Sequence, residues 1–300
     1  MPIIPSDLKI SRISVIIPCY NAADYLEATL RSVINQDDPN VEVVLADGNS
    51  TDGTLEIARQ ATGLLVNIIS EPDRGQLDAL QKGIAIASGD ILLWLNADDI
   101  VMPNAFRDVR EAFRDEKVDF VYSDDVAFDE DIKVVYFGAT IKGLNDWDHF
   151  LFYRQLYSEC VYWRREVTRY LPPSFFDLRV YSDYAFFLNL RWGRRGRWVS
   201  QRLGAFRIRP GQSSAVFKER KMIEYMRIKQ THMAKIGITP IVFHLMRIAY
   251  WPWFALRHKL IPAVHRGTRK GLRILTRDSN RKMLTRIFFD EWLLRGGSHH

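Results

Sequence analysis

Short apolar runs alternate with helical spacings through the first 120 residues. The apolar runs predict buried strands over residues 13–17, 41–45, 67–69 and 91–95. Apolar positions three and four residues apart predict helices over residues 25–33, 54–61 and 76–87, and Pro103 is expected in the first turn of another helix. Strands that alternate with helices in this way indicate an α/β fold with a parallel sheet covered on both faces.

The pattern changes after about residue 120. Strands are expected over residues 120–122 and 133–137, and the mostly apolar stretch 183–190 predicts a helix that is buried on most sides. Residues 218–295 have the spacing of helices. Charged residues and two prolines interrupt the apolar stretch 241–264, so this stretch is a poor candidate for a transmembrane helix.

Charge is divided unevenly along the chain. Residues 1–212 carry 24 Lys and Arg against 31 Asp and Glu, whereas residues 213–300 carry 18 against 5. Residues 240–295 hold 12 basic and 3 acidic residues, with tryptophan, phenylalanine and leucine among them. This combination is typical of a helix in a membrane interface, so we expect an anionic membrane surface as a partner of 240–295. The alternative is a helical subdomain that packs on the core with its basic face in solvent.

The composition excludes several classes of protein. Hydrophobic residues make up 47% and charged residues 26% of the 300, which is typical of a folded protein and not of a disordered or collagen-like chain. Cys19 and Cys160 are too few for a disulfide framework, and a reducing, cytoplasmic setting is expected. No secretory signal is visible at the start, and residues 296–300 resemble the remnant of a tag. Nucleic acid is not expected as a partner, because no recognised nucleic-acid motif accompanies the basic residues.

Acidic residues follow three of the four predicted strands. Asp47 and Asp52 come after the second strand, Asp73 after the third, and Asp98 and Asp99 after the fourth. Ligands of an open parallel sheet bind beyond the carboxyl ends of its strands. Carboxylates gathered there need a cation, and Mg²⁺ or Mn²⁺ bound together with substrate phosphates would supply it. Neither phosphate-binding glycine motif occurs, which argues against the dinucleotide-binding and P-loop classes.

Four segments in order resemble the inverting family 2 glycosyltransferases. The segments are Ile16-Ile17-Pro18-Cys19-Tyr20-Asn21, Asp47-Gly48-Asn49-Ser50-Thr51-Asp52-Gly53-Thr54, Asp73-Arg74-Gly75-Gln76-Leu77-Asp78-Ala79 and Leu95-Asn96-Ala97-Asp98-Asp99. The resemblance covers about residues 11–212 and implies the GT-A fold, with a Rossmann-like mixed central sheet. It also implies a nucleotide-sugar donor and a divalent metal.

The resemblance implies roles for individual residues. Asp47 would contact a uracil-type base, Asp52 would lie near base and ribose, and Asp99 would be the direct metal ligand. Asp98 would contact the ribose, the sugar or the water of the metal. The remaining residues implied in donor binding are Pro18, Tyr20, Asn21, Arg74 and Gly75.

Two departures from the family pattern concern the reaction itself. The segment around Asp183 resembles the acceptor-side Glu-Asp motif, with Ser182 in place of the Glu. The resemblance therefore implies that Asp183 is the general base. Arg209 stands where many members have a histidine, and since a guanidinium pairs with phosphate in a bidentate fork, we expect it to contact the diphosphate.

Each assignment has a purely structural alternative. Asp47 and Asp52 have the residue type that shapes turns and caps helices, and Asp183 could be the N-cap of its helix. Asp98 and Asp99 could likewise cap the helix near Pro103.

The sequence therefore predicts a metal-dependent inverting transferase. It would move a sugar, most simply from a UDP-sugar, to a glycan acceptor linked to polyprenyl diphosphate. A polyprenyl-phosphate glycosyltransferase and a non-catalytic nucleotide-sugar or glycan-binding module are the alternatives. The expected domains are a catalytic domain over 1–212, with a donor half at 11–119 and an acceptor half at 120–212, and a basic helical region over 213–295. The expected location is the cytoplasmic face of the cell membrane.

Overall fold

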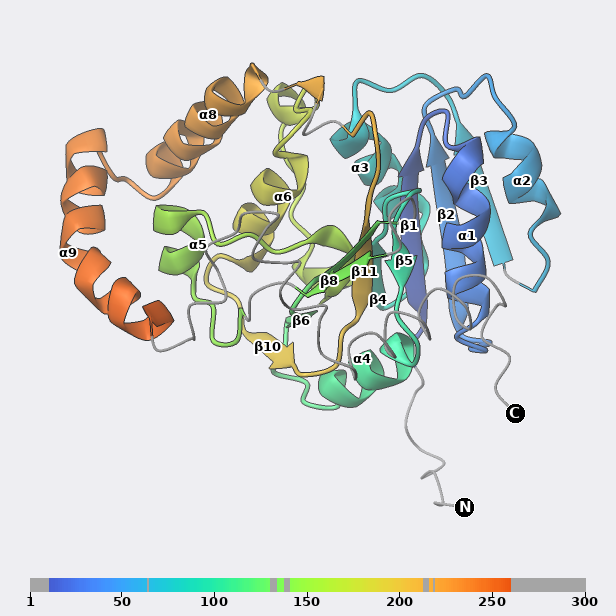
Figure 1. The fold of residues 1–300 in the computed structure, drawn as a ribbon, viewed down its shortest axis with the longest axis horizontal. Helices are drawn as coiled ribbons and strands as arrows, with labels where there is room; N and C mark the ends of the chain where they lie inside the picture. The colour runs from blue at the N-terminus through green and yellow to red at the C-terminus, as the bar shows by residue number, and fades with distance from the viewer. Residues whose placement is uncertain are drawn as a thin grey trace.

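The computed structural model describes residues 11–63, 65–129, 134–137, 141–212, 216–217 and 219–259. Its centre is a seven-stranded sheet with the order β10-β6-β9-β4-β1-β2-β3 (Figure 1). The strands are β1 (Ile13–Cys19), β2 (Val41–Asp47), β3 (Leu65–Ser70), β4 (Ile91–Trp94), β6 (Phe120–Ser123), β9 (Val161–Arg164) and β10 (Gly196–Val199).

Six of these strands run parallel to one another and one runs against them. β1 pairs in parallel with β2 and β4, β2 with β3, and β6 with β10. β9 is antiparallel to both of its neighbours, β4 and β6, and so joins the two parallel groups. The predicted α/β class with a mixed central sheet is confirmed.

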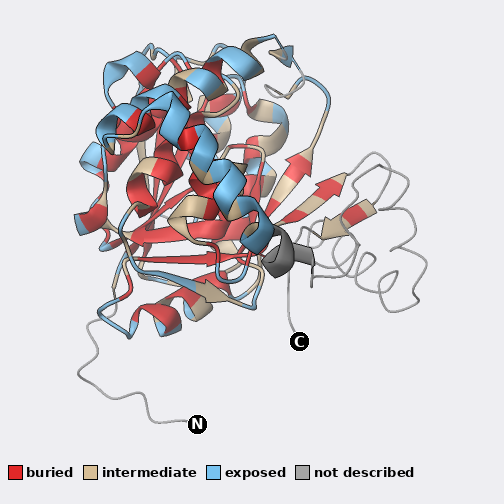
Figure 2. Cartoon of the chain, turned by 90° about the vertical axis from the view of Figure 1, so that its left-hand side faces the viewer, coloured by how far each residue is buried: buried red, intermediate tan, exposed pale blue. Residues whose placement is uncertain are grey.

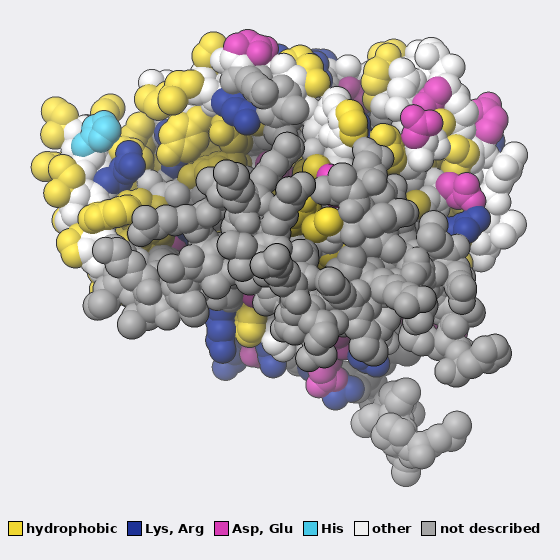
Figure 3. Space-filling model, viewed as in Figure 1, with side chains coloured by type: hydrophobic (Ala, Val, Ile, Leu, Met, Phe, Trp, Pro, Cys, Tyr) yellow, Lys and Arg dark blue, Asp and Glu magenta, His cyan; other side chains and the backbone are white. Residues whose placement is uncertain are grey.

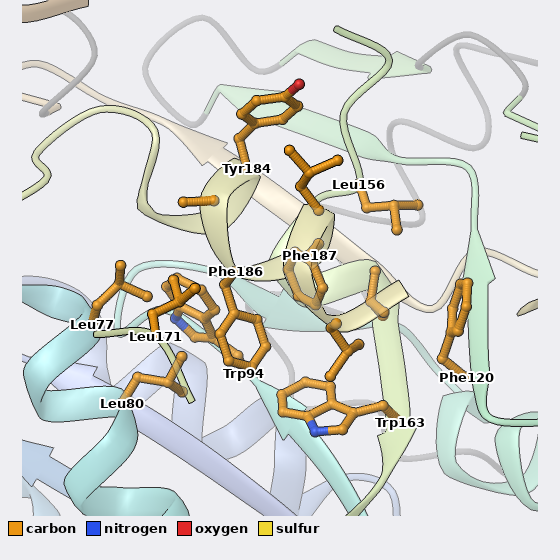
Figure 4. Packing of buried hydrophobic residues seen from close by; sticks show 14 of the residues in the cluster. Leu77, Leu80, Trp94, Phe120, Leu156, Trp163, Leu171, Tyr184, Phe186 and Phe187 are labelled. Carbon is orange, nitrogen blue, oxygen red and sulfur yellow. The ribbon is translucent and has the colours of Figure 1, made fainter. Parts of the chain in front are cut away.

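Helices cover both faces of the sheet, because strand residues alternate in direction. One face packs on α1 (Ala23–Ile34), α2 (Thr54–Gln60) and α4 (Ala105–Phe113) through residues such as Val15 and Leu26. The opposite face packs on α3 (Gln76–Ile86) and α6 (Ser182–Arg191). In Figure 4, Phe186 and Phe187 of α6 lie between Trp94 and Trp163 of the sheet, with the Trp94 and Phe186 ring centroids 5.6 Å apart. Helix α6 is thereby held as a fixed part of the core, as its apolar sequence predicts.

A second, smaller sheet was not predicted. It has the order β5-β11-β7-β8 and comprises β5 (Ile100–Val101), β11 (Gly204–Ile208), β7 (Val126–Asp129) and β8 (Val134–Phe137). It joins the segment after β4 to a segment a hundred residues further along the chain. Because the paired strands are so short, they leave no periodic pattern of apolar residues in the sequence. Helix α4 also begins two residues after Pro103, at Ala105, behind Asn104 in the left-handed conformation (φ 63°).

The remaining helices gather at one end of the molecule (Figure 1). They are α5 (Asp146–Phe152), α8 (Arg220–Lys235) and α9 (Pro240–Lys259); short 3₁₀ turns occupy Ser158–Cys160, Arg165–Val167 and Pro173–Phe175. The helices predicted after residue 218 are confirmed for α8 and α9, while residues 213–215, 218 and 260–300 lie outside the described residues. Among the helices that the structure describes, none combines the length and apolarity needed to span a bilayer.

Candidate active site

A cavity of about 320 Å³ lies beyond the carboxyl ends of β1 and β4. Residues from both strand ends, from the start of α3 and from the loop before α6 line it. Those from the end of β1, the start of α1 and the segment that begins α3 are Pro18, Cys19, Tyr20, Asn21, Ala22, Tyr25, Asp73, Gly75, Gln76 and Ala79; the others are Asn96, Ala97, Asp98, Leu178, Arg179 and Arg209. The structure therefore brings together three of the four sequence segments and adds Arg209 from the end of β11.

The loop after β1 is tied to the loop after β2. The backbone N–H of Asn21 donates to Ser50 Oγ at 2.8 Å, and the Asn21 side chain accepts from the N–H of Thr51 at 2.9 Å. Asn21 adopts φ 48°, a conformation that asparagine tolerates better than most residues. The Tyr20 ring is 64% exposed at the opening of the cavity. Pro18, Tyr20 and Asn21 thus lie where the sequence predicts a donor pocket.

Asp47 and Asp52 do not line this cavity. The buried Asp47 carboxylate accepts from Ser50 N–H at 3.0 Å and from Ser70 Oγ at 2.7 Å, and it also accepts from Cys19. Asp52 accepts from Ala23 N–H and Thr54 N–H, both at 3.0 Å, and so ties the first residues of α1 and α2 together. In the structure both carboxylates hold loops in place, which is the structural alternative weighed from the sequence.

The turn before α3 needs glycine at position 75. Gly75 has φ 137°, and a Cβ there would lie 2.3 Å from the carbonyl oxygen of Phe176. The backbone at Gly75 and the backbone before α6 can approach each other this closely only because glycine has no side chain. Arg74 points away from the cavity, packing over the Phe176 ring at 4.4 Å and pairing with Asp78 at 3.3 Å.

Asp98 and Arg209 form an ion pair at the cavity. Arg209 Nε donates to Asp98 Oδ2 at 2.6 Å, and the guanidinium lies 4.8 Å from the centre of the Tyr25 ring. Both side chains retain partial exposure, 18% for Asp98 and 30% for Arg209. The cavity thus contains an anionic and a cationic group within contact of each other.

Asp99 lies on the other side of the same loop and is fully buried. Its carboxylate accepts from the N–H of Arg207 at 2.9 Å and from the amide of Asn96 at 2.9 Å. Burial, and then the neighbouring Asp98 charge, raise the pKa of Asp99 well above its usual value. Asp98 and not Asp99 lines the cavity, and the direct metal ligation expected of Asp99 stays a prediction.

Asp183 lies in the first turn of α6 and is partly buried. It accepts from the N–H of Tyr184 at 2.7 Å and from the side-chain amide of Gln155. Burial raises the pKa of Asp183 to about 6, although both hydrogen bonds act in the opposite direction. A carboxyl group with such a pKa can accept a proton near neutral pH, as a general base must.

A chain of hydrogen bonds connects the start of α6 with the cavity. Ser182 Oγ donates to Gln76 Oε1 at 2.7 Å, and Gln76 Nε2 donates to Asn96 Oδ1 at 2.7 Å. Gln76 and Asn96 both line the cavity, and Asp183 follows Ser182, whose hydroxyl bonds to Gln76. The sequence analysis missed the roles of Gln76 and Gln155; a polar residue at the first position of α3 was the available signal for Gln76.

The residues at the cavity were tested for their fit to a divalent metal. Asp98 offers one carboxylate of the motif, and Mg²⁺ commonly takes one or two protein carboxylates together with substrate phosphates. Within the part of the chain that the structure describes, no three metal-ligating side chains form a ready-made site. The donor set therefore fits a metal that arrives with a phosphate-bearing ligand.

A larger hollow, about 1060 Å³, lies at the opposite edge of the sheet. Asn40, Asp90 and Ile91 line it, all of them at the amino ends of strands. Asp38 and Arg110, also in its lining, are ion-paired with each other. Parallel sheets bind their ligands at the other edge, so the smaller cavity is the better candidate site.

A cavity beyond the carboxyl ends of parallel strands places the chain in the class of α/β enzymes that bind their ligand there. Its family follows from the comparison with known proteins. The family model described as glycosyl transferase family 2 matches residues 14–165. The chain belongs to this family and is a glycosyltransferase.

Relatives carry the same activity in their names. A PGL/p-HBAD biosynthesis glycosyltransferase of Mycobacterium bovis is 33% identical over 178 residues, which are 58% of this chain and 67% of that protein. A chondroitin synthase of Pasteurella multocida is 31% identical over 118 residues, 38% of this chain and 12% of the synthase.

Solved structures confirm the predicted GT-A fold. The S. aureus TarS fragment in complex with UDP-GlcNAc has a TM-score of 0.57 at 19% identity, covering 96% of this chain and 82% of TarS. A mannosyltransferase of Pyrobaculum calidifontis, solved with GDP-Man and Mn²⁺, also has a TM-score of 0.57, at 18% identity and with 98% and 88% covered.

Proposed function

We propose that the protein transfers a sugar from a nucleoside diphosphate donor, a UDP-sugar in the simplest case, to a glycan acceptor with inversion at the anomeric carbon. The observation that carries the proposal is the position of Asp183. Its carboxyl group has a pKa of about 6 and lies one residue from the hydrogen-bond chain that reaches the donor cavity. The family membership supplies the class of reaction, and the cavity supplies a place for the donor.

The proposed step is a single displacement. The acceptor hydroxyl gives its proton to Asp183 while its oxygen attacks the anomeric carbon. The bond between that carbon and the diphosphate oxygen breaks, and the nucleoside diphosphate leaves with the electron pair. Gln155 and the N–H of Tyr184 keep the carboxylate oriented towards the acceptor side. Among the residues that the structure describes, no charged partner holds Asp183 in its ionised form, so it can take the proton near neutral pH.

Negative charge grows on the diphosphate as it leaves. We propose that, when the donor binds, Arg209 breaks its ion pair with Asp98 and binds a phosphate oxygen instead. A guanidinium can pair with a carboxylate and with a phosphate in the same bidentate way. Asp98, released in this way, would be the carboxylate that holds Mg²⁺ or Mn²⁺, and it replaces Asp99 in that proposed role. Such a metal would neutralise part of the charge on the leaving diphosphate.

The acceptor is proposed to be a glycan on a lipid carrier such as polyprenyl diphosphate. The acceptor side of the site, around α5 and α6, is covered by α8 and α9, which belong to the basic region of the chain. A carrier diphosphate is anionic and its lipid is apolar, and the basic, apolar helices suit both.

The test has a binding stage and a transfer stage. Thermal stability of the whole chain is measured with UDP, GDP, CDP and dTDP, each with and without Mn²⁺ or Mg²⁺, because a ligand of the folded state raises the melting temperature. The selected nucleotide, as its sugar conjugates, is then incubated with lipid-linked oligosaccharide, and the configuration of the new linkage is read by NMR. Inverted product supports the proposal.

In the binding stage, the Asp98→Asn variant tests whether Asp98, and not Asp99, holds the metal. It should abolish the metal-dependent part of the nucleotide shift, whereas Asp108→Asn on α4, on the far face of the sheet, should leave it intact. A metal-dependent shift that survives Asp98→Asn would refute the assignment of the metal to Asp98. Absence of any nucleotide shift would favour the non-catalytic module.

A further inference from the structure

Helix α9 is apolar on two opposite faces. One face packs inward: Phe243 is buried, Tyr250 stacks on Phe152 of α5, and Phe254 stacks on the same ring at 4.1 Å between centroids. A helix with one apolar stripe would satisfy that contact and present polar residues to solvent. The outward face of α9 does not follow this rule.

The outward face of α9 consists of large apolar side chains. Ile241, Leu245 and Ile248 are 73%, 60% and 71% exposed, and their spacing of four and three residues places them on one side of the helix. Trp251 lies beside this stripe at 55% exposure, and its ring also contacts that of Phe152. We call Ile241, Leu245, Ile248 and Trp251 the α9 face. Figure 2 shows α9 as an exposed helix along this end of the molecule.

Helix α8 adds further exposed apolar groups at the same end. Met222 and Ile223 are 68% and 70% exposed and Met226 is 44% exposed. In Figure 3, hydrophobic side chains gather over this end of the molecule, with basic side chains among them. Contiguous apolar surface of this kind marks a site of interaction with a membrane or another macromolecule.

The charge of α9 and of the chain after it distinguishes between the partners that could cover the α9 face. Residues 240–259 contain three basic residues and no Asp or Glu, so a second copy laid face to face on α9 would bring like charges together. The chain from 260 to 295 has nine basic and three acidic residues, so it is no better matched as a cover. An anionic lipid surface complements both features, because tryptophan and leucine enter the acyl boundary while arginine and lysine meet the headgroups.

We propose that the α9 face docks the enzyme on an anionic lipid bilayer as a peripheral membrane protein. Helix α9 contacts α5, and α8 contacts α6 through Lys229, whose Nζ donates to Tyr184 Oη at 2.7 Å. Tyr184 follows Asp183 directly in α6, and the docked surface is therefore joined to the acceptor side by direct packing. Docking does not depend on the proposed reaction, so its test needs no turnover.

The test is flotation of the whole chain with large unilamellar vesicles. Vesicles of phosphatidylcholine that contain phosphatidylglycerol should carry the protein upward, and phosphatidylcholine vesicles should carry at least about tenfold less. Raised salt should reduce the bound fraction, because the electrostatic part is screened. Equal binding to both vesicles, or binding to neither, would overturn the proposal.

Matched variants locate the contact. Leu245→Glu and Ile248→Glu should each lower vesicle partitioning by about tenfold, since each removes an apolar side chain and adds a negative charge. Tyr170→Glu removes a side chain of similar exposure (57%) from another surface and should leave partitioning unchanged. Circular dichroism and the nucleotide shift verify that each variant is folded.

Light scattering distinguishes the other occupants. A chain that stays monomeric and floats only with anionic vesicles agrees with the proposal. Concentration-dependent dimers that Leu245→Glu dissociates, without vesicle binding, would assign the α9 face to a second copy instead. A monomer that binds no vesicle until residues 260–300 are removed would assign it to the C-terminal segment.

Discussion

The acidic residues on the proposed donor side and Asp183 on the proposed acceptor side are stabilised in opposite ways. Asp47 is surrounded by donors from Ser50, Ser70 and Cys19, and Asp98 is paired with Arg209. Among the residues that the structure describes, Asp183 accepts from Gln155 and from the N–H of Tyr184 and has no cationic partner, and burial raises its pKa to about 6. The same residue type thus fixes loops and meets cations on one side, and is ready to take a proton on the other.

The substitution with the largest expected effect on this difference is Asp183→Asn. The variant keeps the size of the side chain but cannot accept the acceptor proton, so turnover should fall by about 10² to 10⁴. The nucleotide-induced rise in melting temperature should remain, because Asp183 does not line the donor cavity. Transfer assays and thermal shifts on the same preparation measure both, and substantial remaining turnover would exclude Asp183 as the base.

Arg209→Ala tests the donor side of the contrast. Hydrogen bonds to charged groups contribute about 1.5–3 kcal/mol, so affinity for the nucleoside diphosphate should fall roughly ten- to hundredfold. Arg209→Lys should recover part of the affinity, since it restores the charge without the bidentate fork. Calorimetric titration with Arg114→Ala as control measures the loss, and equal affinity of all variants would contradict a contact with the diphosphate.

The pH dependence of kcat/KM tests the role of Asp183 without a mutation. A base must be deprotonated, so kcat/KM should be level above the Asp183 pKa and fall about tenfold per pH unit below about 6. Nucleotide affinity measured over the same range separates this effect from titration at the donor cavity. A level kcat/KM down to pH 5 would mean that Asp183 is not the group that takes the proton.

The smallest expected effect belongs to Asp52→Ala. Its carboxylate connects the first residues of α1 and α2, so the variant should lose about 0.5–2 kcal/mol of unfolding free energy, as caps do. Urea denaturation measures the loss. Nucleotide affinity should not change beyond what stability explains, and a specific loss of affinity would instead place the donor ribose at Asp52.

The sequence alone predicts the part of the fold built from local patterns. The periods of apolar residues locate β1 to β4, α1 to α3 and α6, because each element buries a face that its own spacing defines. The carboxyl-edge motifs predict a donor site at one end of the sheet, and the cavity lies there. The strand and helix predictions are confirmed because the alternation and spacing of apolar side chains are local properties, whereas the donor site stays a prediction.

Only the tertiary structure decides which of two adjacent carboxylates reaches the cavity. Asp98 and Asp99 share one loop. The N–H of Arg207 donates to the buried Asp99, whereas Arg209 forms an ion pair with Asp98 at the cavity. Arg207 lies in β11 and Arg209 directly after it, a hundred residues further along the chain, and Gln155 reaches Asp183 from a separate loop. Contacts between segments so far apart depend on how the layers pack, and no local period in the sequence encodes that packing.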